Sequence, residues 1–510
     1  MLKKIVILLI GVGIIASASF YYIDKKNKKQ QVTFEQNQAA PVPVVVAPKL
    51  APIITTDLYQ TFELANGMHV FVIPNHSIPA VSHMVWYRVG AKDEVVGKSG
   101  LAHLQEHLMF KGTDKYPKGE FSKVVAQYGG QENAFTGQDY TAFFQKVPTE
   151  QLELMMQMEA DRMKNLNFND QEFQTERNVV MEEFRMTMKN KPRSLMLQEL
   201  DAALYRNHPY RKQIIGWEDE LKALTRDDAY AFHKKYYDPA NAILVISGDI
   251  DAKTVQPLAE KYYGVIPSNY YEDRQPISEP ERVAFTKVVY EDERVEQQEF
   301  WQKFIAPSYT DKNKDKVKEA YALEVLARLL GGGTSSILYK SLVVEQKLAS
   351  SAGADFSGFN FGPSEVILFA YPQPGVGADA IQAAMAVEVE KVQSGGIDAE
   401  RLEATKKAMI AEQIYDQEGL QQIAYKVAQN YIIGLSPDFS KEWEKGIKAV
   451  TKDDIVTAAI DVLQTQKSAV GILQSVPKAA EPVEAATAKT DAKQAVKKPV
   501  AEKPKAKEKK

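Results

Sequence analysis

The segment Ser99-Gly-Leu-Ala-His103-Leu-Gln-Glu106-His107-Leu-Met-Phe110 places two histidines four residues apart, with a glutamate immediately before the second. Residues four apart on a helix lie one turn apart on the same face, so the imidazoles of His103 and His107 can bind one metal ion. The segment therefore predicts a helix that carries a metal site. Its apolar residues support the helix, because they recur at the spacings of one helical face, at Leu101, Leu104 and Leu108.

The order of the motif is H-x-x-E-H, the reverse of the H-E-x-x-H zinc motif. Two neutral imidazoles suit Zn²⁺, and the carboxylate of Glu106 can accept a proton from water that the metal has acidified. The alternative is that both histidines are ordinary polar surface residues. The chain has only 7 histidines in 510 residues, and by independent frequencies the motif arises by chance in roughly one such chain in two hundred. We therefore favour the metal site.

A catalytic zinc ion usually has three protein ligands and a fourth position open to water, so the site needs a third ligand. The best candidates lie in the segment Thr175-Glu-Arg-Asn-Val-Val-Met-Glu-Glu-Phe184. Glu176 and Glu183 are seven residues apart, which is two helical turns, and share a face, whereas Glu182 points elsewhere. Acidic residues on a helix are usually solvated, so the spacing alone does not decide that either carboxylate binds a metal.

The two motifs together resemble those of a known family. The H-x-x-E-H motif, followed after about 76 residues by the glutamate that closes E-R-x-x-V-x-x-E over residues 176–183, is similar to the pitrilysin/insulinase family of zinc metallopeptidases. That family includes bacterial two-domain members and the mitochondrial processing peptidases. Residues 89–94 and 110–113 resemble the family's active-site flanks. The resemblance covers most of residues 58–476.

This resemblance assigns a role to each residue of the two motifs. It implies that His103, His107 and Glu183 bind one Zn²⁺ per chain and that Glu106 is the general base. It implies that Glu176 is a carboxylate outside the ligand set that orients the site, since such partners fix ligand geometry and tune the metal. The implied activity is hydrolysis of peptides or unfolded protein segments by a metal-activated water.

The segment Asn133-Ala-Phe-Thr136, followed by residues 139–141, resembles the family's strand beside the zinc. The edge of such a strand pairs with the backbone of an extended substrate, which gives affinity with little demand on substrate sequence. The resemblance therefore makes Asn133, Ala134 and Thr136 candidate substrate-binding residues. Without it, Asn133 would be interpreted as a turn residue after Gly129 and Gly130.

A second interpretation comes from a different class of function. Family members often work in pairs, one with the zinc motif and one without, so the chain could be a substrate-holding or assembly subunit of a hetero-oligomeric peptidase. It could form a homodimer, or a heterodimer with a paralogue that lacks the motif. A closed structural zinc site needs four protein ligands and no base, so the presence of Glu106 favours the peptidase.

Composition excludes several classes. At 45% hydrophobic and 25% charged residues the chain can bury sizeable cores. Its net charge is −4, and no basic stripe with interleaved aromatic residues occurs in its body, so nothing favours a nucleic-acid partner. The chain has no cysteine, which excludes disulfides, thiol catalysis and thiolate metal ligands.

Both ends of the sequence differ from its body. Residues 1–29 contain Lys3 and Lys4, then an apolar run over residues 5–23 that includes the small-residue segment Ala16-Ser-Ala18, and then four more lysines over residues 25–29. This pattern predicts a signal peptide or an uncleaved membrane tether. We expect export to the periplasm, free or anchored to the inner membrane. Residues 30–57 form a Pro/Val-rich linker. Residues 477–510, with ten lysines, five acidic residues and no aromatic residue, predict a disordered tail.

The body contains a repeat. The stretch from Leu224-Thr-Arg-Asp-Asp228 to Ser247 recurs from Val450-Thr-Lys-Asp-Asp454 to Leu473 at a constant offset of 226 residues, and threonine is a good first cap of a helix in both copies. With the resemblance, this predicts an α+β fold of two similar α/β halves, each an antiparallel sheet packed with helices, facing each other around a cavity. We expect a catalytic domain over residues 58–268, a linker over 269–283 and a non-catalytic domain over 284–476.

Only the first half can supply the imidazole pair, because no histidine follows His233. The second half contains Leu330-Gly-Gly-Gly333-Thr-Ser-Ser336, which lacks the lysine of a nucleotide-binding P-loop. This segment resembles the glycine-rich loop of the family's non-catalytic half, which is thought to help hold substrate. Many relatives read Ser-Arg-Leu where this chain has Ser336-Ile-Leu338, so a substrate contact by an arginine is in doubt here.

Overall fold

The computed structural model describes residues 50–268, 274–415 and 419–476. The predicted signal or anchor segment, most of the Pro/Val-rich linker and the lysine-rich tail lie outside the described residues. Within the described ranges no helix has the length and apolar character needed to cross a membrane.

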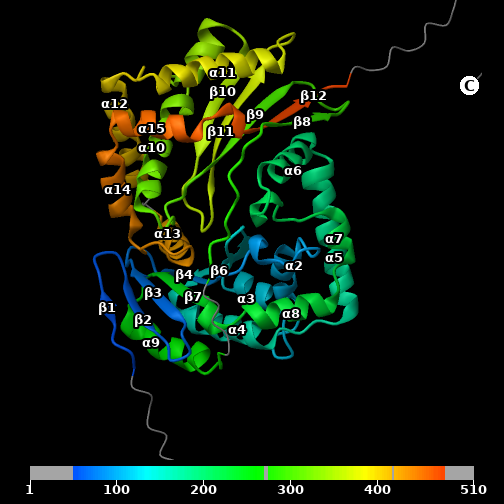
Figure 1. The fold of residues 1–510 in the computed structure, drawn as a ribbon. Coiled ribbons are helices and arrows are strands. Elements are labelled where there is room, and N and C mark those ends of the chain that lie inside the picture. Colours follow the sequence, from blue (N-terminus) through cyan, green and yellow to red (C-terminus); the bar gives the residue numbers. More distant parts are fainter. Residues whose placement is uncertain (1–49, 269–273, 416–418, 477–510) are drawn as a thin grey trace, which may run out of the picture. The chain divides into compact units, whose positions relative to one another are not determined.

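The first half is built on a seven-stranded sheet with the order β1-β2-β3-β7-β4-β6-β5 (Figure 1). Its strands are β1 (Ile54–Thr55), β2 (Gln60–Glu63), β3 (His69–Pro74), β4 (Ala80–Tyr87), β5 (Gln131–Thr136), β6 (Thr141–Pro148) and β7 (Ala242–Gly248). Its helices are α2 (Leu101–Leu108), α3 (Glu120–Gln127), α4 (Leu152–Asn165), α5 (Asp170–Phe184), α6 (Pro192–Leu204), α7 (Glu218–Ala223), α8 (Arg226–Tyr236) and α9 (Ala252–Ala259).

The second half is built on a five-stranded sheet with the order β10-β11-β9-β12-β8. Its strands are β8 (Thr286–Glu291), β9 (Glu299–Ala306), β10 (Ala349–Phe356), β11 (Ser364–Pro372) and β12 (Ala469–Gln474). Its helices are α10 (Lys314–Gly331), α11 (Ala378–Gln393), α12 (Ala399–Tyr415), α13 (Leu420–Ile432), α14 (Phe439–Ala449) and α15 (Lys452–Val462).

The two sheets repeat one topology, which confirms the predicted pair of similar α/β halves. The order β3-β7-β4-β6-β5 in the first sheet matches β8-β12-β9-β11-β10 in the second. The repeated helix start is also present, because Thr225 caps α8 and Thr451 caps α15, each by accepting the backbone N–H of the third helical residue at 3.2 Å.

One detail of the predicted sheets is wrong. Each sheet is mixed and not antiparallel, because β3 pairs with β7 in parallel, and β8 pairs with β12 in parallel. The reason is topological. The last strand of the first half, β7, lies between β3 and β4, and the last strand of the second half, β12, lies between β8 and β9. Each of these last strands follows a long helical segment and runs parallel to β3 or β8.

In each half, one helix packs on the sheet of the other half. One face of the first sheet packs on the helices of its own half, and the opposite face, which carries Phe71 and Trp86, is covered by α13 through Ala424, Val427 and Ala428. Figure 1 shows α13 beside β4 and β7, with which it is in contact. Helix α6 likewise covers the open face of the second sheet. Its apolar residues Met196, Leu200 and Leu204 pack on Ala469 and Leu473 of β12. Residues 51–268, 274–415 and 419–476 therefore belong to one compact unit.

Candidate metal centre

Helix α2 begins as the sequence predicts, at Leu101, directly after Gly100. Gly100 has a φ of +84°, and a Cβ there would lie 2.6 Å from the carbonyl oxygen of Ile215, so a larger residue would not fit. The leucines of α2 are buried in the core of the first half, while His103 and His107 are half-buried on the opposite side. The amphipathic pattern thus directs both imidazoles away from the core.

Helix α5 supplies the acidic side of the site. Its first turn is fixed by Asn169 and Glu172, whose side chains each accept the backbone N–H of the other. Near its other end, Glu183 Oε2 lies 3.5 Å from His107 Nε2 and 3.8 Å from His103 Nε2. Glu182, one residue earlier, pairs instead with Arg185 on the surface.

These three side chains suit a metal ion. Their donor atoms all lie within 4.8 Å of one another, and no other group of three or more His, Cys, Asp or Glu side chains in the described part of the chain is arranged in this way. Ligand atoms of tetrahedral zinc, at about 2.0–2.1 Å from the ion, are separated by roughly 3.4 Å. Two imidazole nitrogens and one carboxylate oxygen at these separations therefore fit Zn²⁺ with a further position left for water.

The two histidines have opposite electrostatic environments. Burial, with a smaller contribution from His107, lowers the pKa of His103 to about 4, so this imidazole is neutral and able to bind a metal at neutral pH. Burial also acts to lower the pKa of His107, but its hydrogen bond to Glu176 and the charges of Glu106, Glu176 and Glu183 outweigh that effect and raise it. A metal ion bound at His107 must therefore compete with a proton.

Glu176 lies behind His107. Its Oε1 is 3.1 Å from His107 Nδ1, and its Oε2 pairs with the ammonium group of Lys111. Burial acts to raise the pKa of Glu176, but the hydrogen bonds from His107 and Lys111 lower it overall, so the carboxylate is ionised. A histidine that ligates through Nε2 usually donates its Nδ1 proton to such a group. Lys111 lies in the flanking segment 110–113, and no local sequence pattern relates it to Glu176.

Glu106 projects from the same helix into the pocket and is 8% exposed. Its Oε2 accepts a hydrogen bond from Thr136 Oγ1 at 2.5 Å. Burial raises the pKa of Glu106; the Thr136 hydrogen bond and His107 act in the opposite direction, but burial outweighs them. The group is thus a stronger proton acceptor than an exposed carboxylate.

Strand β5 carries the three candidate substrate-binding residues, and it is the edge of the first sheet. Ala134 and Thr136 line the pocket that contains His103, Glu106, His107 and Glu183, which has a volume of about 490 Å³. Asn133 is exposed, and its side chain accepts the backbone N–H of Ala134 at 2.9 Å. The pocket wall also includes residues 213–215, which no sequence motif singled out.

The N-terminus of α2 is held by a second set of residues that sequence reasoning missed. The side chain of Glu94 is fully buried, accepts the backbone N–H of Ala102 at 2.8 Å and pairs with Lys212 at 2.5 Å. The hydroxyl of Ser99 accepts the backbone N–H of Trp217 at 2.8 Å. These contacts join the start of α2 to Lys212 and Trp217, which lie on either side of the pocket wall at residues 213–215.

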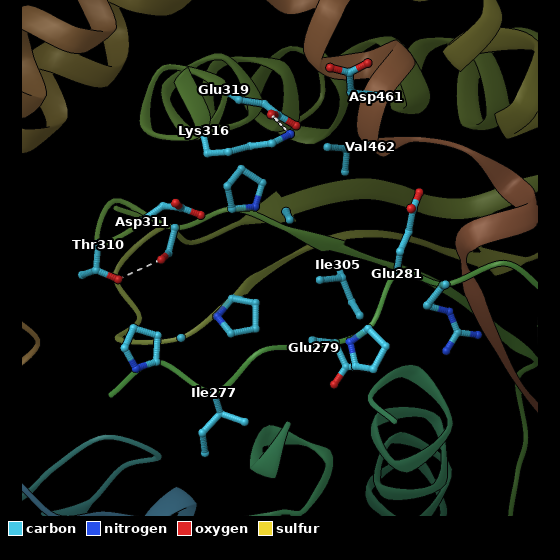
Figure 2. Close-up of a pocket in the computed structure, with 18 of the residues that line it drawn as sticks. Ile277, Glu279, Glu281, Ile305, Thr310, Asp311, Lys316, Glu319, Asp461 and Val462 are labelled. Atoms are coloured by element: carbon cyan, nitrogen blue, oxygen red, sulfur yellow. Dashed lines mark hydrogen bonds and ion pairs between the residues drawn. The ribbon is translucent and has the colours of Figure 1, made fainter. Parts of the chain in front are cut away.

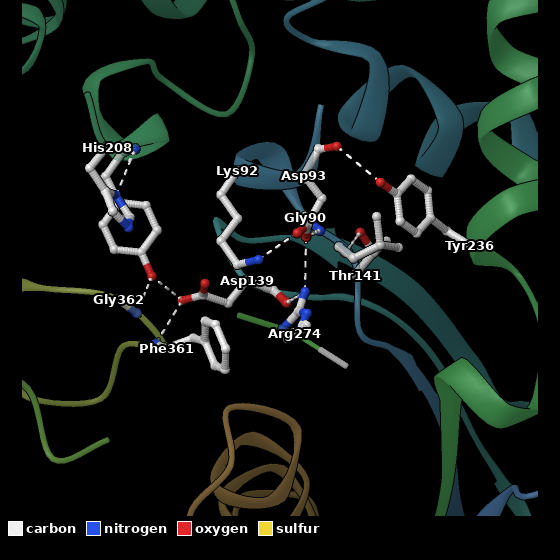
Figure 3. Close-up of polar contacts among 12 residues, drawn as sticks. Gly90, Lys92, Asp93, Asp139, Thr141, His208, Tyr236, Arg274, Phe361 and Gly362 are labelled. Atoms are coloured by element: carbon white, nitrogen blue, oxygen red, sulfur yellow. Dashed lines mark hydrogen bonds and ion pairs between the residues drawn. The ribbon is translucent and has the colours of Figure 1, made fainter. Parts of the chain in front are cut away.

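A buried polar cluster joins the end of β5 to the second half (Figure 3). Asp139, in the turn after β5, accepts hydrogen bonds from the Tyr210 hydroxyl at 2.6 Å and the Phe361 N–H at 3.2 Å. Arg274 donates to the carbonyl oxygen of Asp139 at 2.6 Å and to the carboxylate of Asp93 at 2.9 Å. The position of the β5 turn therefore depends on contacts from both halves and from the segment between them.

Larger cavities lie elsewhere. One of about 710 Å³ is bounded by residues 276–282, the end of β9 and the start of α10, and its wall carries Glu319 and Asp461 (Figure 2). Another of about 710 Å³ is lined by the glycine segment 331–333 and by α13. Neither is lined by a histidine, whereas the smaller pocket at α2 is lined by both His103 and His107.

Comparison with known families gives two matches. A model described as Insulinase (Peptidase family M16) matches residues 69–218, which include α2, β5 and α5. A model described as Peptidase M16 inactive domain matches residues 223–409.

Individual relatives agree with these matches. The chain is 33% identical over 394 residues to the zinc protease PqqE of Helicobacter pylori, over 76% of this chain and 86% of that protein. It is 26% identical over 356 residues to an uncharacterized zinc protease, YmxG, of Bacillus subtilis, over 69% and 83% of the two chains. Among solved structures, a protease from Helicobacter pylori matches with a TM-score of 0.74 and 30% identity, over 81% of this chain and 99% of the other. The first half of the periplasmic protease PqqL from Escherichia coli matches in fold, with a TM-score of 0.70 and 20% identity, over 84% and 93%.

Proposed function

Because the chain belongs to the insulinase-type M16 peptidase family, we propose that it is a zinc-dependent endopeptidase that cleaves extended peptides or unfolded protein segments. The single observation that carries this proposal is the joint placement of His103, His107 and Glu183 around one point, with Glu106 in the same pocket. A zinc ion held there would polarise the scissile carbonyl group and acidify a water molecule.

The protein's own residues account for the proton transfers. Glu106 would take a proton from the attacking water and pass it to the leaving amine, first as general base and then as general acid. Its burial, which raises its pKa, suits it to both tasks. Glu176 would hold His107 in the tautomer that leaves Nε2 free to bind the metal, because the two groups meet through Nδ1 at 3.1 Å.

The open edge of β5 supports the proposed substrate class. An open strand edge beside the site binds a peptide that is itself extended, because the contacts are main-chain hydrogen bonds. Asn133, Ala134 and Thr136 would form this docking edge, and a folded protein could not present its backbone there. We propose export of the enzyme to the periplasm, supported by the predicted segment at residues 1–29 and by the description of PqqL as periplasmic.

A second candidate function is a role within a hetero-oligomer. The match of residues 223–409 to an inactive domain agrees with a half that binds and does not cleave. In a pair with a paralogue that lacks the motif, this chain would be the catalytic member, because it carries His103, Glu106 and His107.

The test is zinc content together with hydrolysis of a mixed quenched-peptide library, with and without a chelator. We expect about one zinc per chain and cleavage that the chelator abolishes. Glu106→Gln should keep zinc and lose nearly all turnover, whereas Glu183→Gln should lose zinc. Glu182→Gln, a change of the neighbouring surface carboxylate, is the matched control and should alter neither.

The outcomes separate the two functions. Zinc without cleavage by the chain alone would favour the hetero-oligomer, and a chain with no zinc would refute the metal centre altogether. Full turnover by Glu106→Gln would remove Glu106 as the base.

A further inference from the structure

We propose that Thr136 is a positioning residue that links the docking of a peptide on β5 to the orientation of the Glu106 carboxylate. The inference rests on the proposed peptidase function and adds to it a specific coupling between binding and catalysis. Its basis is the hydrogen bond from Thr136 Oγ1 to Glu106 Oε2 at 2.5 Å. Among the described residues, Thr136 is the one hydrogen-bond donor to that carboxylate.

The backbone of Thr136 faces the open edge of the sheet. Gly137 N–H donates to the Tyr140 carbonyl at 2.7 Å, so these two residues form a hydrogen-bonded pair across the hairpin. Hydrogen-bonded and non-hydrogen-bonded pairs alternate along antiparallel strands. Thr136, which pairs with Thr141, is therefore in a non-hydrogen-bonded pair, and its N–H and C=O point away from β6. A peptide added to this edge would bind them.

The side chains of β5 alternate in a way that serves the same arrangement. Ala134 and Thr136 line the pocket of the metal centre. Phe135 packs on the opposite face of the sheet, against Trp86 at a ring-centroid distance of 5.1 Å and against Tyr425 of α13 at 5.5 Å. The strand is thus held from behind by the second half, so that a peptide docking on its edge meets a backbone that is already fixed.

Thr136 consequently offers two groups with separate purposes. Its backbone N–H and C=O are available to the peptide, and its hydroxyl donates a hydrogen bond to one oxygen of Glu106. A carboxylate with Oε2 held in this way presents Oε1 to the attacking water, whereas a carboxylate without this bond can rotate about its terminal torsion, which is broad. Proton transfer from the attacking water requires that the general base lie within hydrogen-bond distance of that water.

The competing explanation is that Thr136 only stabilises the strand. Valine separates the two explanations, because it is β-branched, has nearly the same shape and favours strands, but lacks the hydroxyl. Thr136→Ser keeps the hydroxyl and gives up the β-branch. Thr61→Val is the matched control, because Thr61 lies in β2, near the other edge of the same sheet, and its hydroxyl donates to the Val70 carbonyl at 2.8 Å.

The first measurement is steady-state cleavage of a quenched peptide. We expect Thr136→Val to lower kcat roughly 10- to 100-fold, as for loss of a hydrogen bond to a charged group, with KM and zinc content as in the wild type. Thr136→Ser should recover most of kcat, and Thr61→Val should match the wild type. An unchanged kcat in Thr136→Val, or a loss confined to KM, would overturn the proposal.

Two readouts are independent of turnover. The affinity of metal-free Glu106→Gln for the peptide should be the same with and without Thr136→Val; a weaker affinity would show that Thr136 holds the peptide. A crystal structure of metal-free Thr136→Val should show the Glu106 carboxylate turned from its wild-type position, and an unmoved carboxylate would refute its positioning by Thr136. Should valine prevent folding, Thr136→Ala replaces it in each measurement. Failure of wild-type protein to bind zinc and cleave peptide refutes the peptidase function, whereas the crystal structures still decide the role of Thr136.

Discussion

The stability of Glu94→Gln, measured relative to that of the wild type, should increase as the pH rises. The Glu94 carboxyl is fully buried at the N-terminus of α2, where it accepts the Ala102 N–H and pairs with Lys212. Burial raises its pKa to about 7, and the opposing contributions of Lys212 and the backbone N–H groups do not cancel that rise. Glutamine retains the shape and an oxygen acceptor for Ala102 but cannot ionise.

The magnitude follows from the two protonation equilibria. The usual pKa of a glutamate is 4.5, and in the folded protein that of Glu94 is about 7. A raised pKa stabilises the folded state at pH values below the unfolded value, and this contribution is lost as the pH rises through the folded value. Between about pH 5 and about pH 8.5 the free energy of unfolding of the wild type should therefore fall by roughly 2.5 kcal/mol through the ionisation of Glu94. Glu94→Gln should lose none by this route.

The assay is urea denaturation of metal-free wild-type and variant protein at both pH values, followed by tryptophan fluorescence. The variable is the difference in unfolding free energy between variant and wild type, because effects of pH on all other groups cancel in it. This difference should move by roughly 2.5 kcal/mol in favour of Glu94→Gln on going to the higher pH. A difference that stays constant would show that Glu94 is ionised throughout and that its pairing with Lys212 outweighs burial.

Three further predictions concern other parts of the molecule. Glu176→Gln should weaken zinc binding about 10- to 100-fold, measured by competition with a chromophoric chelator. It should also lower the metal-free melting temperature, because the buried ammonium group of Lys111 loses its carboxylate partner. Wild-type zinc affinity would contradict the contact of Glu176 with His107. Gly331→Ala should cost about 2 kcal/mol of stability in thermal denaturation, because its Cβ would lie 1.7 Å from the Ala354 nitrogen. Gly377→Ala is the control and should cost no stability, because its Cβ would meet nothing within 4 Å. Leu200→Ala, at a fully buried position on α6, should cost about 2–5 kcal/mol in urea; a smaller loss would mean that α6 contributes little to the second sheet.

The elements predicted correctly are those encoded by neighbouring residues. The face formed by His103 and His107 depends only on a spacing of four on one helix, and the caps at Thr225 and Thr451 depend only on the three residues that follow each threonine. The parallel pairing of β3 with β7 was not predicted, because it joins residues such as His69 and Ile243 that no local pattern relates. A strand's alternation predicts which face is buried, but not which strand lies beside it.

The same division holds within the site. Glu183 was brought into the ligand set by a family resemblance and not by its spacing from Glu176, which left both carboxylates open. Lys111, Glu94 and residues 213–215 escaped notice because their roles depend on contacts between segments far apart in the chain. The resemblance placed Thr136 at the docking edge, but the hydrogen bond from its hydroxyl to Glu106 joins residues 30 positions apart that no local pattern relates.

Because each sheet is covered by a helix from the opposite half, neither half can be separated from the other without exposing apolar surface. A fragment ending at Ser268 would carry an uncovered apolar sheet face and an unpartnered helix α6, and the complementary fragment would carry the same defects in mirror form. The two pieces are mutually dependent, so a chain cut between Ser268 and Arg274 should remain associated without the peptide bond. Such reciprocal exchange is the signature of a swapped symmetric dimer. The two halves of the present chain meet as the subunits of such a dimer do, although one peptide chain joins them.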